Sequence, residues 1–191
     1  VMDALNGGNK RRLTNSTGNI AELEPSWSPD GRQIAFRVMG CTQEDELYKA
    51  NAYQASTATT CEEMKPQSIT NEAPGHDRNP AWSPDGKLIA YASYININPD
   101  IFVISSEGHS VNGATGGFNL TPGDDWSTSF DYWPAWSADM STIAFVSNYY
   151  PITTGQNGMY IHTIAMSYPD SSNSLQFEAI VIPTPQNNTF C

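Results

Sequence analysis

Positive charge is missing from more than half of this chain. All nine Lys and Arg residues lie at or before Lys87, so residues 88–191 contain none, against eight Asp and Glu, and the formal net charge is −11. Binding to nucleic acid depends on clustered cations that neutralise phosphate, and an anionic membrane surface makes the same demand. We therefore expect neither as a partner. A basic partner or a divalent cation suits the acidic half better.

Residues for the familiar catalytic and metal sites are also scarce. The 191 residues include three His and three Cys, and they lack the patterns Gly-x-Ser-x-Gly, His-x-x-x-His and Cys-x-x-Cys. The sequence therefore offers no zinc or dithiol redox centre and no set of nucleophile, base and orienting acid. No apolar run reaches about 18 residues, so no transmembrane helix is expected.

What the chain has instead is a repeat. Three segments read PSWSPDGRQIAFRV, PAWSPDGKLIAYAS and PAWSADMSTIAFVS, and they begin at Pro25, Pro80 and Pro134 with spacings of 55 and 54 residues. A fixed period of this size indicates a structural unit that stacks on copies of itself.

Each copy predicts a hairpin followed by two more strands. Ser-Pro-Asp-Gly is a type I turn signal between two strands. Third strands are expected from Glu46, Asp100 and Gly158, and fourth strands near Ser68–Thr70, Asn119–Thr121 and Ala179–Ile182. Four short strands per period describe one blade of a β-propeller. A β-sandwich is the alternative, but it leaves the recurring turn unexplained.

The repeat fixes a set of structural positions. We expect its tryptophans to pack between neighbouring sheets, although a ligand-stacking role is the alternative. The structural positions are Trp27, Trp82 and Trp136, with the turn residues Asp30, Gly31, Asp85, Gly86 and Asp139.

These motifs resemble the TolB-like, WD-repeat-like β-propeller family, whose blades carry a Pro-x-Trp-Ser-Pro-Asp-Gly turn followed by x-x-Ile-Ala-Phe. Residues 25–36 and 80–91 match closely, and residues 134–145 depart at Ala138 and Met140. We expect the third turn to be looser or differently shaped, because a non-glycine residue is strained where φ is positive. The resemblance implies an all-β propeller in a periplasmic or extracellular setting. It leaves the function open, because propellers host many activities.

About three and a half blades fit into the chain. We expect a half blade at residues 1–20, blades at about 21–75, 76–129 and 130–182, and a tail or linker start rich in Pro, Thr and Asn at 183–191. Propellers close with about four to eight blades. The chain is therefore expected to form part of a larger closed propeller, and the alternative is an open arc capped by partner subunits.

One disulfide is expected. Cys41 and Cys61 flank the third strand of the first full blade, and the chain as a whole is rich in Asn, Thr, Ser and Gly and low in charge, as many exported β-proteins are. A bridge across this 20-residue span stabilises by roughly 3 kcal/mol in the loop-entropy model. The alternative is three ordinary thiols, with Cys191 unassigned.

An acidic residue stands three positions before the repeat proline in every copy. These residues are Glu22, Asp77 and Asp131. In a propeller this position lies near the mouth of the central channel, where an arc of carboxylates could bind Ca²⁺. No cofactor is certain, and calcium is the one candidate. The alternative is that each carboxylate accepts hydrogen bonds from the loop between blades.

Aromatic and acidic residues gather before the third repeat. Aromatics beside carboxylates on a loop form the best candidate surface for a partner outside the repeat cores. The candidate contact residues are Asp124, Asp125, Trp126, Tyr132 and Trp133. The alternative is that Tyr132 and Trp133 pack on the next blade.

Three functions compete at this stage. The first is a non-enzymatic scaffold that binds a protein or peptide through its loop face or channel mouth. The second is a structural subunit of an extracellular or cell-surface assembly. The third is the gating propeller of a prolyl oligopeptidase-type serine peptidase, whose catalytic domain is absent from these residues and would have to follow in an intact chain.

Overall fold

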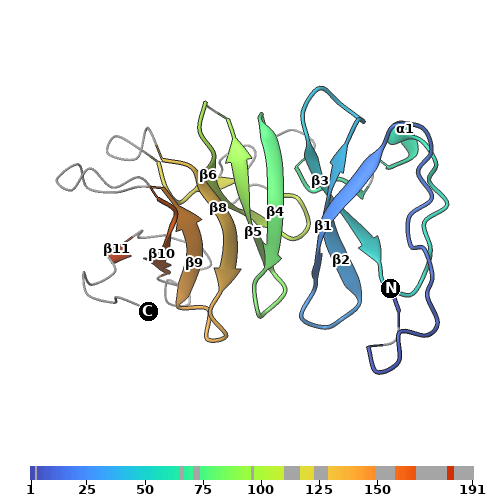
Figure 1. The fold of residues 1–191 in the computed structure, drawn as a ribbon, viewed down its shortest axis with the longest axis horizontal. Coiled ribbons are helices and arrows are strands. Elements are labelled where there is room, and N and C mark those ends of the chain that lie inside the picture. Colours follow the sequence, from blue (N-terminus) through green and yellow to red (C-terminus); the bar gives the residue numbers. More distant parts are fainter. Residues whose placement is uncertain are drawn as a thin grey trace.

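The protein is built almost entirely from antiparallel strands, arranged as three sheets that stand in a row (Figure 1). The computed structural model describes residues 1–2, 4–64, 67–70, 74–95, 97–109, 117–122, 129–148, 158–166 and, for the backbone, 180–182. The all-β class predicted from the repeat is confirmed. We call the sheets blades 1 to 3.

Each blade is a meander of consecutive strands. Blade 1 contains β1 (Ala21–Trp27), β2 (Gln33–Met39) and β3 (Glu46–Asn51). Blade 2 contains β4 (His76–Trp82), β5 (Leu88–Tyr94), β6 (Asp100–Ser105) and β7 (Phe118–Asn119). Blade 3 contains β8 (Asp131–Trp136), β9 (Thr142–Ser147), β10 (Tyr160–Ala165) and β11 (Ile180–Ile182). Within the described residues, the fourth strand of blade 1 is represented by a single bridge between Tyr48 and Ser68.

The same turn closes the first hairpin of every blade. In blade 1, the Asp30 carboxylate accepts hydrogen bonds from the Ser28 hydroxyl and the Arg32 amide, at 2.6 and 3.0 Å. Asp85 and Asp139 do the same in blades 2 and 3.

The expectation of a different third turn was wrong. Met140 adopts φ 63°, close to the 69° of Gly31, and its amide donates to Ser137 O at 3.0 Å as Gly31 does to Ser28 O at 2.9 Å. The aspartate bonds hold the turn in shape, and the strain at Met140 costs on the order of 1 kcal/mol.

The first strand of every blade is an edge strand with a bulge. The pairing with the second strand shifts register at the repeat proline, and the residue before that proline has positive φ in all three copies: Glu24 (55°), Asn79 (54°) and Trp133 (52°). β4 packs against both β1 and β8, so these edges lie side by side. A bulge and a proline blunt an exposed strand edge against pairing with another chain.

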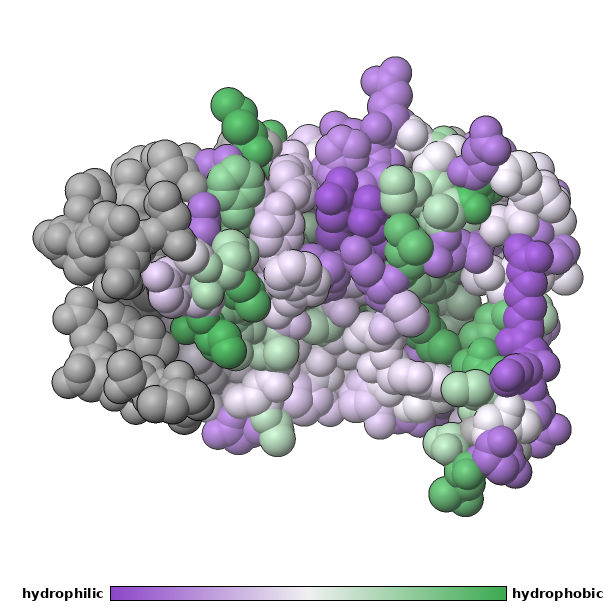
Figure 2. Space-filling view, in the orientation of Figure 1, coloured by the Kyte–Doolittle hydropathy of each residue, from purple (hydrophilic) through white to green (hydrophobic). Residues whose placement is uncertain are grey.

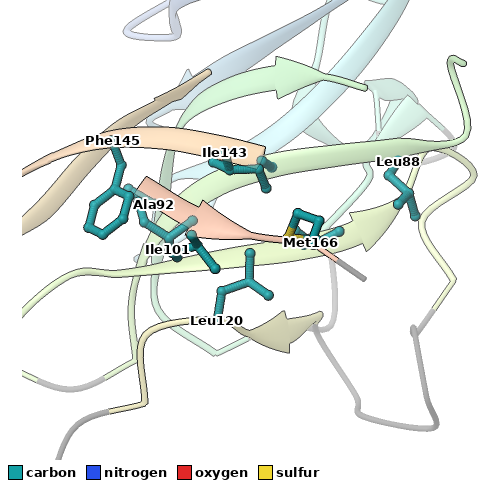
Figure 3. Close-up of a cluster of buried hydrophobic side chains, with 10 residues drawn as sticks. Leu88, Ala92, Ile101, Leu120, Ile143, Phe145 and Met166 are labelled. Atoms are coloured by element: carbon teal, nitrogen blue, oxygen red, sulfur yellow. The ribbon is translucent and has the colours of Figure 1, made fainter. Parts of the chain in front are cut away.

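Blades dock through apolar side chains. Figure 3 shows the cluster between blades 2 and 3, which is fully buried at its centre. Blade 2 supplies Leu88, Ala90, Ala92, Ile101, Val103 and Leu120, and blade 3 supplies Ile143, Phe145, Ile164 and Met166. Between blades 1 and 2 the members are Ala35, Leu47, Ile69, Trp82, Ile89, Tyr91, Phe102 and Ile104.

The repeat tryptophans do not share one environment. Trp82 is 9% exposed within the cluster between blades 1 and 2. Trp136 packs against the next cluster and donates its indole N–H to Ala81 O at 3.1 Å. Trp27 is 53% exposed, so the expectation of a buried tryptophan fails there. The reason is that, among the described residues, no sheet covers this side of blade 1.

The N-terminal stretch also differs from expectation. The described part of residues 1–20 contains no strand, so a half blade is not seen there. Its backbone pairs instead with the loop after β3, through Ser56 N to Leu13 O at 2.7 Å and Thr17 N to Thr59 O at 3.1 Å. Without neighbouring strands of its own, this stretch takes its hydrogen bonds from that loop.

The predicted Cys41–Cys61 disulfide is present. It ties the β2–β3 loop to the short helix α1 (Cys61–Met64), and the helix lies over the outer face of blade 1, where Met64 packs with Phe36 and Tyr48. No helix in the described ranges is long and apolar enough to cross a membrane.

Replacing Cys41 and Cys61 together by Ser should lower the free energy of unfolding by about 3 kcal/mol, because the bridge closes a 20-residue loop in the unfolded chain. Denaturant melts of oxidised, reduced and double-variant protein measure this. The reduced wild type is the control, and it should match the double variant. Equal stability of oxidised and reduced protein would contradict the expectation.

Candidate functional site

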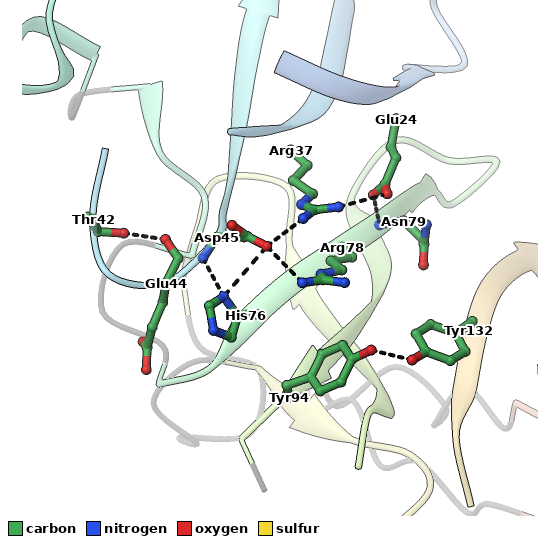
Figure 4. Close-up of polar contacts among 10 residues, drawn as sticks. All are labelled: Glu24, Arg37, Thr42, Glu44, Asp45, His76, Arg78, Asn79, Tyr94 and Tyr132. Atoms are coloured by element: carbon green, nitrogen blue, oxygen red, sulfur yellow. Dashed lines mark hydrogen bonds and ion pairs between the residues drawn. The ribbon is translucent and has the colours of Figure 1, made fainter. Parts of the chain in front are cut away.

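A buried carboxylate joins blade 1 to blade 2. The Asp45 carboxylate lies before β3, and its Oδ2 contacts Arg37 Nη2 at 2.6 Å, Arg78 Nη2 at 3.1 Å and His76 Nδ1 at 3.5 Å (Figure 4). The side chains of Asp45 and Arg37 are each 9% exposed. One acid thus binds two arginines, one from β2 and one from β4, at the seam between the blades, and the His76 ring from β4 accepts a hydrogen bond from the Asp45 amide at 3.0 Å.

Glu24 extends this network to the bulged edges. Its carboxylate contacts Arg37 Nη1 at 3.2 Å and accepts a hydrogen bond from the Asn79 amide at 2.7 Å. Both Glu24 and Asn79 occupy the strained bulge position. The positive φ turns the Asn79 amide out of its own ladder, so that the carboxylate of the preceding blade can accept from it.

A run of rings continues from this network into blade 3. The Arg78 guanidinium lies 4.9 Å from the centre of the Tyr94 ring. Tyr94 is 6.0 Å from Tyr132, and Tyr132 is 5.4 Å from Trp133, measured between ring centres. The hydroxyls of the two tyrosines are hydrogen-bonded to each other (Figure 4). Such spacings are typical of favourable aromatic pairs.

Exposed apolar side chains flank these rings along the chain. Trp133 is 59% exposed and Ile97 is 91% exposed, with Ile95 and Phe130 also exposed. The hydrogen bond from Asp131 N to Pro99 O holds the loop after β5 beside the start of β8. Figure 2 shows hydrophobic residues projecting above the upper ends of β5 and β6, next to a strongly hydrophilic area over β4. We call Tyr94, Ile95, Ile97, Phe130, Tyr132 and Trp133 the aromatic surface.

The aromatic surface includes two of the predicted contact residues, Tyr132 and Trp133. Asp124, Asp125 and Trp126 lie outside the described residues. Sequence reasoning missed Tyr94, which ends the second strand of the previous repeat, and it missed Ile95 and Ile97, which lie in the loop after that strand. The signal available was the repeat itself, since Tyr94 falls one residue after the PAWSPDGKLIAYAS copy.

The three predicted calcium ligands occupy three separate settings. Asp77 and Asp131 are fully buried at the starts of β4 and β8, and neither side chain reaches solvent. Glu22 is half-buried, and its carboxylate accepts hydrogen bonds from the hydroxyls of Thr14 and Ser16, at 2.5 and 2.6 Å. Within the described ranges, no three Asp, Glu, His or Cys side chains gather as a metal site.

Each buried aspartate instead has an acidic neighbour that the sequence analysis did not pair with it. Glu46 at the start of β3 acts on Asp77, and Asp100 at the start of β6 acts on Asp131. Burial raises the pKa of Glu46 to about 7 and that of Asp131 to about 6, and it raises the pKa of Asp77 well above its usual value. Glu46 and Asp100 are each the first residue of the third strand of a blade. Aligning the third strands of the repeats would therefore have shown that they are equivalent.

These three blades resemble parts of solved β-propellers. No family model matches the chain. The putative TolB from Agrobacterium tumefaciens superposes with a TM-score of 0.55 at 21% identity, over 78% of this chain and 47% of that chain. TolB from Acinetobacter baumannii superposes with a TM-score of 0.51 at 22% identity, over 74% of this chain and 29% of that chain.

A third match comes from a different protein. Prolyl oligopeptidase B from Galerina marginata gives a TM-score of 0.54 at 9% identity, over 85% of this chain and 22% of that chain. At these identities the likeness concerns the fold alone, and the fold is that of a β-propeller. The chain spans less than half the length of all three, which fits part of a larger propeller.

Replacing Asp45 by Asn should lower the free energy of unfolding by on the order of 3 kcal/mol, because Arg37 would stay buried with Glu24 as its remaining acidic partner. Thermal and urea melts measure this. Glu107→Gln is the matched control, since the Glu107 side chain is 66% exposed and its pair with Lys49 contributes less than about 1 kcal/mol. Similar losses in both variants would contradict a special role for Asp45.

The calcium prediction has its own test. If the acidic positions bind Ca²⁺, the melting temperature should rise as CaCl₂ is added and fall again with EDTA, because the ion binds only the folded state. Asp77→Asn and Asp131→Asn should abolish the response. An unchanged melting temperature across the titration would count against calcium at these positions.

Proposed function

We propose that this chain is part of a propeller scaffold that binds a protein or peptide segment on the aromatic surface. The observation that carries the proposal is the exposed Trp133, held by a strained backbone beside two hydrogen-bonded tyrosines. Aromatic residues that are fixed before binding lose little conformational entropy, and tryptophan and tyrosine dominate the energetic centres of protein interfaces.

The surroundings favour recognition by side chains. β-Augmentation is disfavoured, because the adjacent edge strands β4 and β8 each carry a bulge and a proline. Arg78 is already engaged by Asp45 and Tyr94, so it is a poor receptor for a partner's acidic group. An apolar or aromatic anchor, flanked by basic residues that complement the net charge of −11, fits the surface best.

We propose further that binding, and not catalysis, is the role of these blades, in a periplasmic or extracellular setting. His76 accepts a hydrogen bond from the Asp45 amide, His162 is buried against Phe145, and His109 is exposed after β6. The three histidines thus lie in three unrelated places. The Cys41–Cys61 disulfide is of the kind that persists in oxidising compartments.

A peptide display library panned against the purified chain tests the binding proposal. Selected peptides should bind Trp133→Ala at least about tenfold more weakly than wild type, because losing a central aromatic anchor costs more than about 1.4 kcal/mol. Isothermal titration with synthetic peptides measures the affinities.

Trp27→Ala is the matched control, because Trp27 is 53% exposed at the outer side of blade 1 and belongs to no part of the aromatic surface. It should leave the affinities unchanged. Peptides that bind Trp133→Ala as tightly as wild type, or a library that yields no binder, would overturn the proposal.

A further inference from the structure

A cleft lies between the turns of blades 1 and 2, at the end of the blades opposite the aromatic surface. It is formed by the β1–β2 turn, the β4–β5 turn and the turn after β6, and the first two lie at the lower end of the blades in Figure 1. Its volume is about 430 Å³, within the range of about 300–1,000 Å³ that is usual for ligand sites. The side chains that line it include Asp30, Arg32, Gln33, Trp82, Asp85 and Glu107.

The charged groups at the cleft are already paired with one another. Measured between nitrogen and oxygen, the ion pairs are Asp30 with Arg32 at 4.0 Å, Asp85 with Lys87 at 3.9 Å and Glu107 with Lys49 at 2.9 Å. Among the described residues, three acids thus meet three bases. Carboxylate, guanidinium and ammonium groups each have more hydrogen-bonding positions than one such pair uses. The cleft therefore offers donors and acceptors together, without a surplus charge that would attract an ion.

Contacts between the two blades fix the shape of the cleft. Lys49 Nζ donates a hydrogen bond to Ser106 O at 2.9 Å, which ties β3 to the turn after β6. A Cβ added to Gly86 would lie 3.3 Å from Pro29 Cγ, so the β1–β2 and β4–β5 turns are in close contact. Both turns are also held by their own aspartate hydrogen bonds. A cleft that is formed before binding loses little conformational entropy when a ligand enters.

The cleft is also lined by a buried hydrogen-bond donor that has no acceptor. Trp82 is 9% exposed, and its indole N–H has no partner within the described part of the chain. A buried donor without an acceptor is unfavourable. At the next junction the equivalent tryptophan, Trp136, donates to Ala81 O at 3.1 Å. The junction of blades 1 and 2 thus lacks an acceptor that its neighbour has, and a ligand oxygen could supply it.

The amide side chains at the cleft are specific to this junction. Gln33, which begins β2, is paired with Asn51 at the end of β3, and both line the cleft. The equivalent pair of blade 2 is Leu88 with Ser105, so neither amide is repeated there. An amide side chain both donates and accepts hydrogen bonds. The residues suited to a polar ligand therefore occur at the junction where the tryptophan lacks its acceptor.

We propose that this cleft binds a neutral saccharide unit. A sugar hydroxyl donates one hydrogen bond and accepts others, so it can join a carboxylate oxygen of Asp85 or Glu107 to an amide such as that of Gln33. A sugar oxygen beside Trp82 also supplies the acceptor that the indole N–H lacks. An ion fits less well, because each charged group of the cleft already has a partner of opposite charge. The site is separate from the aromatic surface and gives these blades a second binding activity.

Nuclear magnetic resonance of the isotope-labelled protein tests the site. The probes are glucose, galactose, N-acetylglucosamine and disaccharides of each, added at millimolar concentrations. The indole N–H signal of Trp82, assigned with Trp82→Phe, should shift as a sugar binds, because a sugar oxygen becomes its acceptor. The signal of Trp136 is the internal control and should stay in place, since Ala81 O already accepts from it. A panel in which no sugar shifts the Trp82 signal would overturn the proposal.

Gln33→Leu tests the polar lining without disturbing the fold, because leucine occupies the equivalent position in blade 2. It should weaken sugar binding roughly three- to tenfold, as expected for the loss of one neutral hydrogen-bonding side chain, with an unchanged melting temperature. Gln43→Leu makes the same exchange at an exposed position in the loop after β2, at the opposite end of that strand, and should bind as wild type does. Equal affinities of Gln33→Leu and wild type would contradict the site.

The charge of the ligand has a separate test. Binding of a neutral sugar should change little between low and high salt, because salt screens interactions between charges. An affinity that falls steeply with added salt, or a stronger response to glucuronic acid than to the neutral sugars, would rule out a neutral ligand. A shift of the Trp82 signal by an uncharged peptide, in place of the sugars, would also overturn the proposal.

Discussion

Docking of one blade on the next is the interaction on which everything else here depends. A single sheet of three or four strands cannot bury both of its faces, so each blade is stable only with a neighbour. Ala35 and Leu47 of blade 1 share one buried cluster with Trp82 and Ile89 of blade 2. The ion-pair network of Asp45 and the aromatic rings from Tyr94 to Trp133 also lie at these junctions. The packing of the blades therefore determines their geometry.

The architecture could be predicted from the repeat, because each copy contains the residues that determine its own turn and hairpin. A Ser-Pro-Asp-Gly turn specifies its own hairpin, and the three first hairpins and the Cys41–Cys61 bridge lie where the sequence indicated. Met140 was misjudged because the Asp139 hydrogen bonds outweigh its strain. The burial of Trp27 was predicted wrongly, because burial at this position depends on whether a neighbouring sheet covers it. The sequence around the tryptophan does not show this.

The candidate site was harder to predict, because its members meet only after blades dock. Tyr94 and Tyr132 are 38 residues apart, and Asp45 and Arg78 are 33 apart. Neither pair is marked by a motif. The acidic residue before each proline was found from spacing alone, but its burial, and its neighbour on the preceding blade, depend on which way a strand faces. A one-residue change of register would have turned those carboxyls toward solvent.

The bulge before each repeat proline shows how such a scaffold accommodates variety. Glu24, Asn79 and Trp133 have the same backbone conformation at the same point of successive blades. An acid, an amide and an indole therefore occupy equivalent positions. Because the backbone and the following proline determine this conformation, it constrains the type of side chain only weakly. Successive blades can therefore present different side chains from the same backbone frame, and a change at one of these positions also affects the next blade where a contact such as that of Glu24 with Asn79 crosses the junction.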